Sequence, residues 1–128
     1  MKKAIAITLA LVMVVLFAGC GLQSQLARTA WELIEKEGAV ETISIFSFEL
    51  GNVYKEEVRC YVNGVLSSDA NETYSNEGKW AVDGEELTIT YEDGYVFVCR
   101  AVIEGDTLDL IQEKNGVTYK LTLTRIKK

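Results

Sequence analysis

Residues 78–125, GKWAVDGEELTITYEDGYVFVCRAVIEGDTLDLIQEKNGVTYKLTLTR, decide the fold of this chain. Turn pairs recur in this stretch about every ten or eleven residues, at Asp83-Gly84, Asp93-Gly94, Gly105-Asp106 and Asn115-Gly116. Asp-Gly and Asn-Gly reach the positive φ angles of tight hairpin turns, and the runs between them are rich in β-branched and aromatic residues. Evenly spaced strands of this kind indicate an antiparallel up-and-down meander that closes into a barrel.

The residue pattern predicts about eight strands in an all-β fold. Five follow from the opening stretch: Lys79–Val82, Leu87–Tyr91, Tyr95–Ile103, Thr107–Gln112 and Val117–Arg125. Two more are expected upstream, at Thr42–Leu50 and Val53–Val62, joined by a Gly51-Asn52 turn. Period-two alternation assigns one face of these strands to the interior. The expected interior residues are Trp80, Val82, Leu87, Ile89, Tyr91, Tyr95, Phe97, Cys99, Ile103, Leu108, Leu110, Tyr119, Leu121 and Leu123.

The charge balance excludes some functions. Of the 13 Lys and Arg residues, Lys2 and Lys3 lie in the first 20 residues, whereas all 19 Asp and Glu residues follow Cys20. The remainder carries 11 basic residues and a formal net charge of −8. This balance argues against nucleic acid as a partner, because phosphate binding needs clustered Lys and Arg. The chain has no histidine, the commonest general base and metal ligand, and we expect no metal, cofactor or enzymatic activity.

The first 20 residues, MKKAIAITLALVMVVLFAGC, have the form of a secretory leader. Two lysines precede an apolar run of about 15 residues, shorter than the roughly 20 that a spanning helix needs. The ending Phe17-Ala18-Gly19-Cys20 resembles the lipobox of bacterial lipoproteins, although that family usually has Leu where Phe17 stands. The resemblance implies a signal peptide over residues 1–19 and a Cys20 that carries diacylglycerol and a further acyl chain such as palmitate. An extracytoplasmic protein anchored to a bacterial membrane is therefore expected.

The segment after Cys20 allows two interpretations. We predict a lipidated cysteine and polar tether over residues 20–25, followed by one barrel domain over residues 26–128. Leu26 to Gly38 has helical spacing, with Ser24 as a candidate N-cap, but Trp31 and Leu33 also alternate as on a strand. We expect at least Trp31–Ile34 to join the sheet.

The domain resembles small lipocalin-like domains of bacterial lipoproteins. The residues that carry the resemblance are Trp31, the Trp80–Leu87 and Ile103–Leu108 repeats, and the terminal Tyr119–Arg125. In lipocalins, a Trp on the first strand packs against an Arg at the end of the last strand and closes the barrel. The resemblance implies that Trp31 and Arg125 make this contact here. The family's Gly two residues before the Trp is replaced by Thr29.

Aromatic side chains on the inner face are candidates for lining a ligand cavity. They are Phe46, Phe48, Trp80, Tyr91, Tyr95, Phe97 and Tyr119. The alternative is that these rings fill the barrel. Cys60 and Cys99 also face inward, as free thiols or as a disulfide, although their strands are not neighbours in a simple meander.

Other polar groups are weaker candidates. The Asn63–Gly78 connection is the longest and could contact a partner or be a solvated loop. Asp69, Asn71 and Glu72 match no known calcium-loop spacing, and the pairs Glu56-Glu57 and Glu85-Glu86 fit solvated charge better than acid–base catalysis.

Two functional hypotheses remain. The first is a membrane-anchored, non-enzymatic lipoprotein that binds a small apolar or amphipathic molecule in its barrel. The alternative is an envelope interaction module with a filled core, which presents the Asn63–Gly78 loop or an outer face formed by Val96, Val98 and Val102. A cavity lined by the aromatics would favour the first, and a filled core with exposed valines the second.

Overall fold

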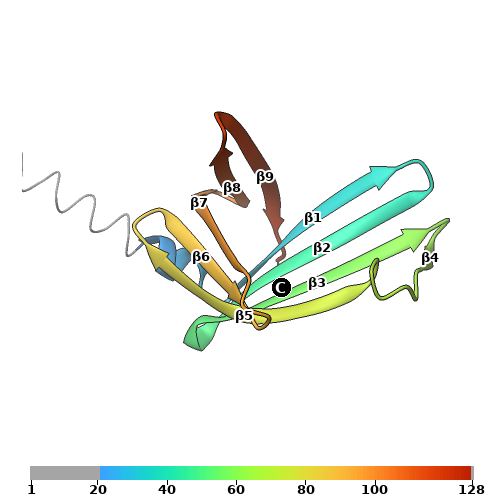
Figure 1. Cartoon of the computed structure of the whole chain (residues 1–128), viewed down its shortest axis with the longest axis horizontal. Coiled ribbons are helices and arrows are strands. Elements are labelled where there is room, and N and C mark those ends of the chain that lie inside the picture. Colours follow the sequence, from blue (N-terminus) through green and yellow to red (C-terminus); the bar gives the residue numbers. More distant parts are fainter. Residues whose placement is uncertain (1–20, 128) are drawn as a thin grey trace, which may run out of the picture.

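The structure is a computed structural model that describes residues 21–127, and it contains a closed antiparallel barrel of eight long strands (Figure 1). The predicted signal peptide and Cys20 lie outside the described residues. The long strands are β1 (Thr29–Glu37), β2 (Val40–Glu49), β3 (Val53–Val62), β5 (Tyr74–Asp83), β6 (Glu86–Tyr91), β7 (Val96–Glu104), β8 (Thr107–Lys114) and β9 (Val117–Arg125). A two-residue strand, β4 (Val65–Leu66), pairs with the end of β3, and a 3₁₀ turn, η1 (Leu50–Asn52), joins β2 to β3.

The eight strands pair in chain order, and β9 returns to β1 to close the ring. The all-β meander and its closure into a barrel are therefore confirmed. The expected strand over Trp31–Ile34 is also confirmed, since β1 pairs with β2 along its whole length. The local propensity of this segment allows both a helix and a strand. Its pairing with β2 therefore determines that it is a strand.

Two boundary predictions were wrong. Residues 21–26 are helical, and their Leu22 and Leu26 belong to the core, so this segment is not a free tether and Ser24 is not an N-cap. The expected Asn63–Gly78 loop is shorter, because Tyr74–Gly78 is the first half of β5 and pairs with β3. The polar residues there form a strand because the β3 ladder supplies partners for their backbone groups.

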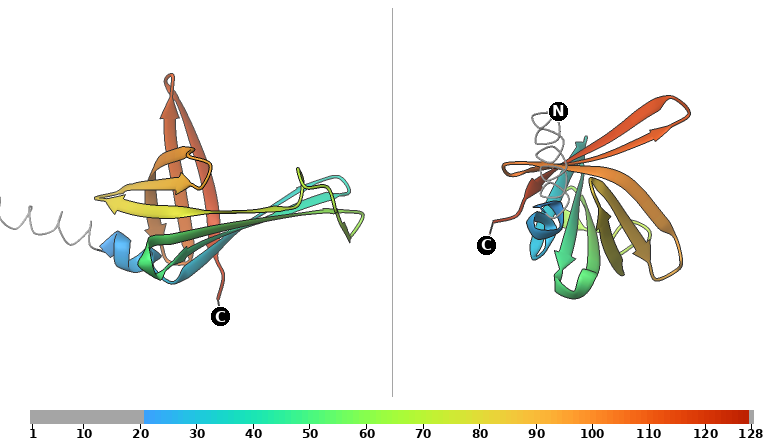
Figure 2. Two further views of the ribbon diagram at one scale, coloured as in Figure 1. Left: turned by 60° about the horizontal axis from the view of Figure 1, so that its bottom comes forward. Right: turned by 90° about the vertical axis from the view of Figure 1, so that its left-hand side faces the viewer.

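The core fills the end of the barrel at which β1 begins. It contains Trp31, Phe48, Tyr54, Trp80, Leu87, Ile89, Leu108 and Leu123, together with Leu22 and Leu26 from the helix. The helix thus covers this end, which we call the base. At the opposite end, which we call the open end, the strands diverge (Figure 2, left). The β8–β9 hairpin extends one way there, and β1, β2 and β3 extend another.

Candidate functional site at the open end of the barrel

The open end results from two ladders that stop early. The ladder that closes the barrel has only two residue pairs, Trp31 with Arg125 and Glu32 with Thr124. Continuing this register would place Lys36 opposite Lys120 and the acidic Glu35 opposite Leu121. Like charges directly opposite each other destabilise a strand pair, so the sequence disfavours a longer ladder. Likewise, β7 pairs with β8 only from Arg100 onward, and the tip of the β8–β9 hairpin continues alone.

Eight apolar side chains are exposed at this end, although register places them on the same face of the sheet as the core. Their exposed fractions lie between 38% and 69%. We call them the open-end residues: Val40, Val62, Val65, Tyr74, Tyr95, Val117, Tyr119 and Leu121. The prediction that Tyr95, Tyr119 and Leu121 lie in the interior was therefore wrong as to burial. Alternation assigned these side chains to the correct face of the sheet. They are exposed because the strands diverge at this end and no opposing strands cover them.

A polar cluster around Glu56 of β3 lies between the filled core and the open end. Tyr54 and Tyr91 donate hydroxyl hydrogen bonds to Glu56 Oε1 over 3.1 and 3.2 Å. Asn76 Nδ2 donates to Glu56 Oε2 over 3.1 Å. Burial, helped by the negative charge of Glu56, raises the pKa of Tyr91 to about 12 and also raises the pKa of Tyr54. Both phenols therefore stay protonated and keep donating to the carboxylate.

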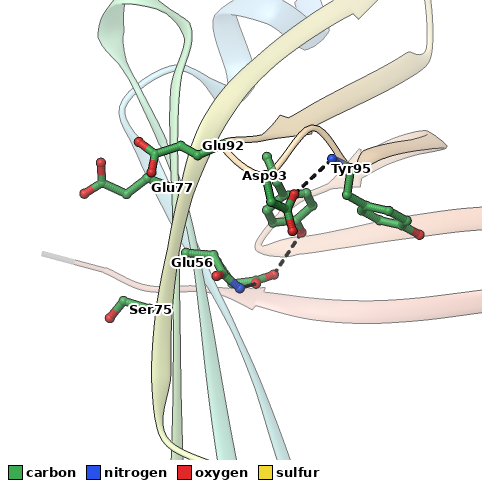
Figure 3. A pocket seen from close by; sticks show the side chains of 8 residues that line it. Glu56, Ser75, Glu77, Glu92, Asp93 and Tyr95 are labelled. Atoms are coloured by element: carbon green, nitrogen blue, oxygen red, sulfur yellow. Dashed lines mark hydrogen bonds between the residues drawn. The ribbon is translucent and has the colours of Figure 1, made fainter. Parts of the chain in front are cut away.

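A pocket of about 590 Å³ adjoins this cluster (Figure 3). It lies between the first half of β5 and the β6–β7 turn, because β6 pairs with β5 only from Gly78 onward. Its lining combines four carboxylates, Glu56, Glu77, Glu92 and Asp93, with the rings of Tyr91 and Tyr95. The two ring centroids are 5.9 Å apart. Ser75 and Glu77 lie on the opposite side of β5 from Glu56, so the pocket extends around the edge of β5.

The structure separates the predicted ligand-lining aromatics into three groups. Phe48 and Trp80 are 1% and 2% exposed and pack edge to face in the filled core, with ring centroids 5.5 Å apart. Phe46 and Phe97 pack against that core and are half-buried. Tyr91 and Tyr95 line the pocket, whereas Tyr119 lies on the β8–β9 hairpin. The seven rings therefore do not line one common chamber.

Trp31 and Arg125, the two residues that the lipocalin resemblance implies for barrel closure, contact each other at the base. Trp31 is completely buried, and the guanidinium carbon of Arg125 lies 4.6 Å from the centroid of its ring. The Trp31 indole Nε1 donates to Thr29 Oγ1 over 2.8 Å. Thr29 Oγ1 in turn donates to the carbonyl oxygen of Leu26, the last residue of the helix. The contacts of Trp31 thus join β1 and β9 to the helix at the base.

Cys60 on β3 and Cys99 on β7 are free and buried, so the disulfide alternative between them does not form. These strands are not neighbours in the sheet, and two cysteines must approach closely to bridge. Burial raises the pKa of the Cys99 thiol to about 12. A thiol that stays protonated is a poor nucleophile, so Cys99 fits a packing role.

Three of the remaining polar candidates, Glu57, Asp69 and Glu72, make local contacts. Glu57 accepts from Arg59 over 2.7 Å on the outer face, while its neighbour Glu56 points inward. In the 67–73 loop, Asp69 accepts from the Asn71 backbone and Glu72 accepts from Ser67. Among residues 21–127, no cluster of three or more His, Cys, Asp or Glu side chains is arranged to hold a metal ion. No helix in the same range has the length and apolar character needed to cross a membrane.

Sequence reasoning missed the cluster around Glu56. The Glu56-Glu57 pair predicts solvated charge, yet Glu56 alternates with Tyr54, Val58 and Cys60 on an inward face. A carboxylate in an inward run was the available signal. Its partners Asn76 and Tyr91 could be assigned only from the strand pairing.

Comparison with known proteins gives little further information. No protein-family model matches the chain, and no curated protein matches it. Among solved structures, it is similar to the crystal structure of the Cpx pathway activator NlpE from Escherichia coli, at 18% sequence identity and a TM-score of 0.48. The match covers 66% of this chain and 42% of the NlpE chain, so it spans less than half of that protein's structure.

Proposed function

We propose that this protein is a non-enzymatic lipoprotein of the bacterial cell envelope, anchored through Cys20, and that the open end of its barrel binds another envelope protein. The observation that carries the proposal is the exposure of the eight open-end residues above a filled core. Apolar side chains gathered on one exposed surface are typical of interaction sites. A ligand in the centre of the barrel would instead have to displace Phe48 and Trp80, which are packed against each other.

The open edge of β9 offers backbone partners for an extended segment. The Arg125 N–H donates to Asp106 on the β8 side, whereas the Ile126 N–H donates to Ala30 on the β1 side. Alternation directs the N–H and C=O groups of Thr122, Lys120 and Thr118 to the β1 side, beyond the end of the two-pair ladder. An added strand would pair with these groups and cover Val117, Tyr119 and Leu121 with its own apolar residues.

The amino-acid inventory supports a non-enzymatic role. The chain has no histidine that could activate a nucleophile. The raised pKa of Cys99 keeps its thiol protonated, and the raised pKa of Tyr91 keeps its phenol protonated. Glu56, the inward carboxylate, already accepts three hydrogen bonds from Tyr54, Tyr91 and Asn76.

Site-specific photo-crosslinking in bacterial cells tests the interaction. A photoreactive amino acid replaces Tyr119 at the open end or, as the matched control, Thr90 on the exposed outer face of β6. We expect one discrete adduct, identified by mass spectrometry, at position 119 and none at position 90. A Leu121→Asp change should abolish that adduct while circular dichroism shows an intact fold. The same adduct at both positions, or one insensitive to Leu121→Asp, would refute the site.

A second candidate function is the binding of a small amphipathic molecule in the pocket beside Tyr91 and Tyr95. Its volume of about 590 Å³ lies within the range of small-molecule sites, and it combines two aromatic rings with polar groups. Native mass spectrometry of residues 22–128 with a panel of amphiphiles tests it. We expect an adduct that is weakened at least tenfold by Tyr95→Ser and unchanged by Tyr119→Ser, which lies outside the pocket. A bare mass with every amphiphile would exclude this candidate.

A further inference from the structure

We infer that the base of the barrel lies against the membrane surface and that the open end points away from it, into the aqueous compartment. The inference rests on the lipid anchor at Cys20 proposed above. It assigns the base as a lipid-facing surface and determines from which side a partner reaches the open end.

The first step is the docking of the helix that follows the anchor. Leu22 and Leu26 are 6% and 0% exposed and lie one helical turn apart, so both point into the base of the core. The Ala27 N–H donates to the Gln23 carbonyl over 3.1 Å, and the Arg28 N–H donates to the Phe48 carbonyl over 2.7 Å. The segment is therefore held to the barrel on both its apolar face and its C-terminal end.

The second step is the covalent reach of the anchor. Cys20 precedes Leu22 by two residues, and a residue of extended chain spans at most about 3.6 Å. The Cα atom of Cys20 therefore lies within about 7 Å of the Cα atom of Leu22, whose side chain is buried in the barrel base. A lipid attached there brings the base to the bilayer surface, with no flexible linker that would let the barrel turn over.

The third step is the direction of the strands. The helix, η1, the Asp83–Glu86 turn and the end of β9 all lie at the base, whereas the β8–β9 turn at Asn115-Gly116 lies at the open end (Figure 2). The nine residues of β9 span about 30 Å at about 3.3 Å per residue. The hairpin tip therefore lies about one strand length from the end of β9 at the base.

The surface chemistry of the base favours contact without deep insertion. Leu50 of η1 is 56% exposed at this end and can enter the headgroup region. Asp83 and Glu85 lie in the neighbouring β5–β6 turn, and their negative charge opposes deeper burial among anionic headgroups. As a consequence, the partner of the open end approaches from the aqueous side and is not taken laterally from the bilayer.

Fluorescence quenching on vesicles tests the orientation. Full-length protein, acylated in cells, is reconstituted into vesicles of phosphatidylethanolamine and phosphatidylglycerol that carry a nitroxide on the lipid headgroup. Glu85→Cys labels the base and Glu113→Cys labels the β8–β9 tip; both residues are exposed, and both changes remove one negative charge. The parent protein, with its buried Cys60 and Cys99, controls for background labelling. We expect quenching at position 85 to exceed quenching at position 113 at least threefold.

The outcomes separate the orientation from the anchor. Equal quenching at the two positions, or stronger quenching at position 113, with Cys20 shown by intact mass to be acylated, overturns the orientation alone. An unmodified Cys20 overturns the anchor and the orientation together. A ten-residue Gly-Ser insertion between Cys20 and Gly21 should remove the difference between the two labels. A difference that survives this insertion refutes the short connection as its cause.

Discussion

The guanidinium carbon of Arg125 lies 4.6 Å from the centroid of the Trp31 ring, and the two residues face each other across the two-pair ladder that closes the barrel. Because β1 and β9 share only two residue pairs, we infer that side-chain contacts supply much of the free energy that holds these strands together. A cation over an indole ring contributes about 0.5–2 kcal/mol, and the buried indole contributes more through its apolar area.

We therefore expect Trp31→Ala to lower the free energy of unfolding by about 3–5 kcal/mol and Arg125→Met by about 1–2 kcal/mol. Urea unfolding followed by circular dichroism measures both. The double variant should lose less than the sum of the two single losses, because the residues interact directly. Strictly additive losses would show that the contact contributes nothing of its own.

The helix of residues 21–26 should contribute to the stability of the barrel. Leu26→Ala removes a completely buried side chain, and we expect a loss of about 2–5 kcal/mol in the free energy of unfolding. Gln25→Ala, at the neighbouring exposed position, is the control and should change it by less than about 0.5 kcal/mol. Equal effects of the two changes in urea unfolding would show that the helix does not cover the base in solution.

Gly78 should not tolerate a side chain. It pairs with both Tyr54 and Tyr91, and a Cβ there would lie 2.3 Å from the carbonyl oxygen of Thr90. Because that neighbour is backbone, Gly78→Ala should destabilise the fold by about 1–3 kcal/mol or more. Gly21→Ala, where a Cβ meets nothing within 4 Å, should leave thermal stability unchanged or slightly raised. A Gly78→Ala protein with an unchanged melting temperature would contradict this packing.

Alkaline pH should destabilise the protein through Tyr91. Its folded-state pKa of about 12 exceeds the ordinary value of 10.0, so the stabilisation is complete below pH 10 and is lost as the pH rises toward 12. Tyr54 and Cys99, whose pKa values are also raised, act in the same direction. Urea midpoints at pH 8, 10 and 11 measure the fall, which should be shallower in Tyr91→Phe. Identical slopes for both proteins would rule out Tyr91 as a contributor.

Only part of the candidate site could be predicted from the sequence. Alternation placed Tyr95, Tyr119 and Leu121 on the inner face, but no local pattern shows that the strands around them diverge. The Glu56 cluster joins residues of β3, β5 and β6. Their hydrogen-bond distances depend on the pairing of β5, which lies beside β3 in its first half and pairs with β6 from Gly78 onward. Pairing across 20 to 35 residues is a tertiary property.

The sequence alone determined most of the strands after Thr42, their turns and their inner faces, because hairpin turn residues and period-two alternation act locally. Asn115 and Gly116 illustrate this: both adopt the positive φ angles that their dipeptide predicts. The tertiary structure decided that residues 21–26 join the core, that Trp31 belongs to a strand, and that the barrel is filled at its base and open at the other end. Those outcomes depend on which side chains pack together across the β1–β9 ladder. Where local propensity allows both helix and strand, the burial of apolar side chains against residues distant in sequence selects one of them.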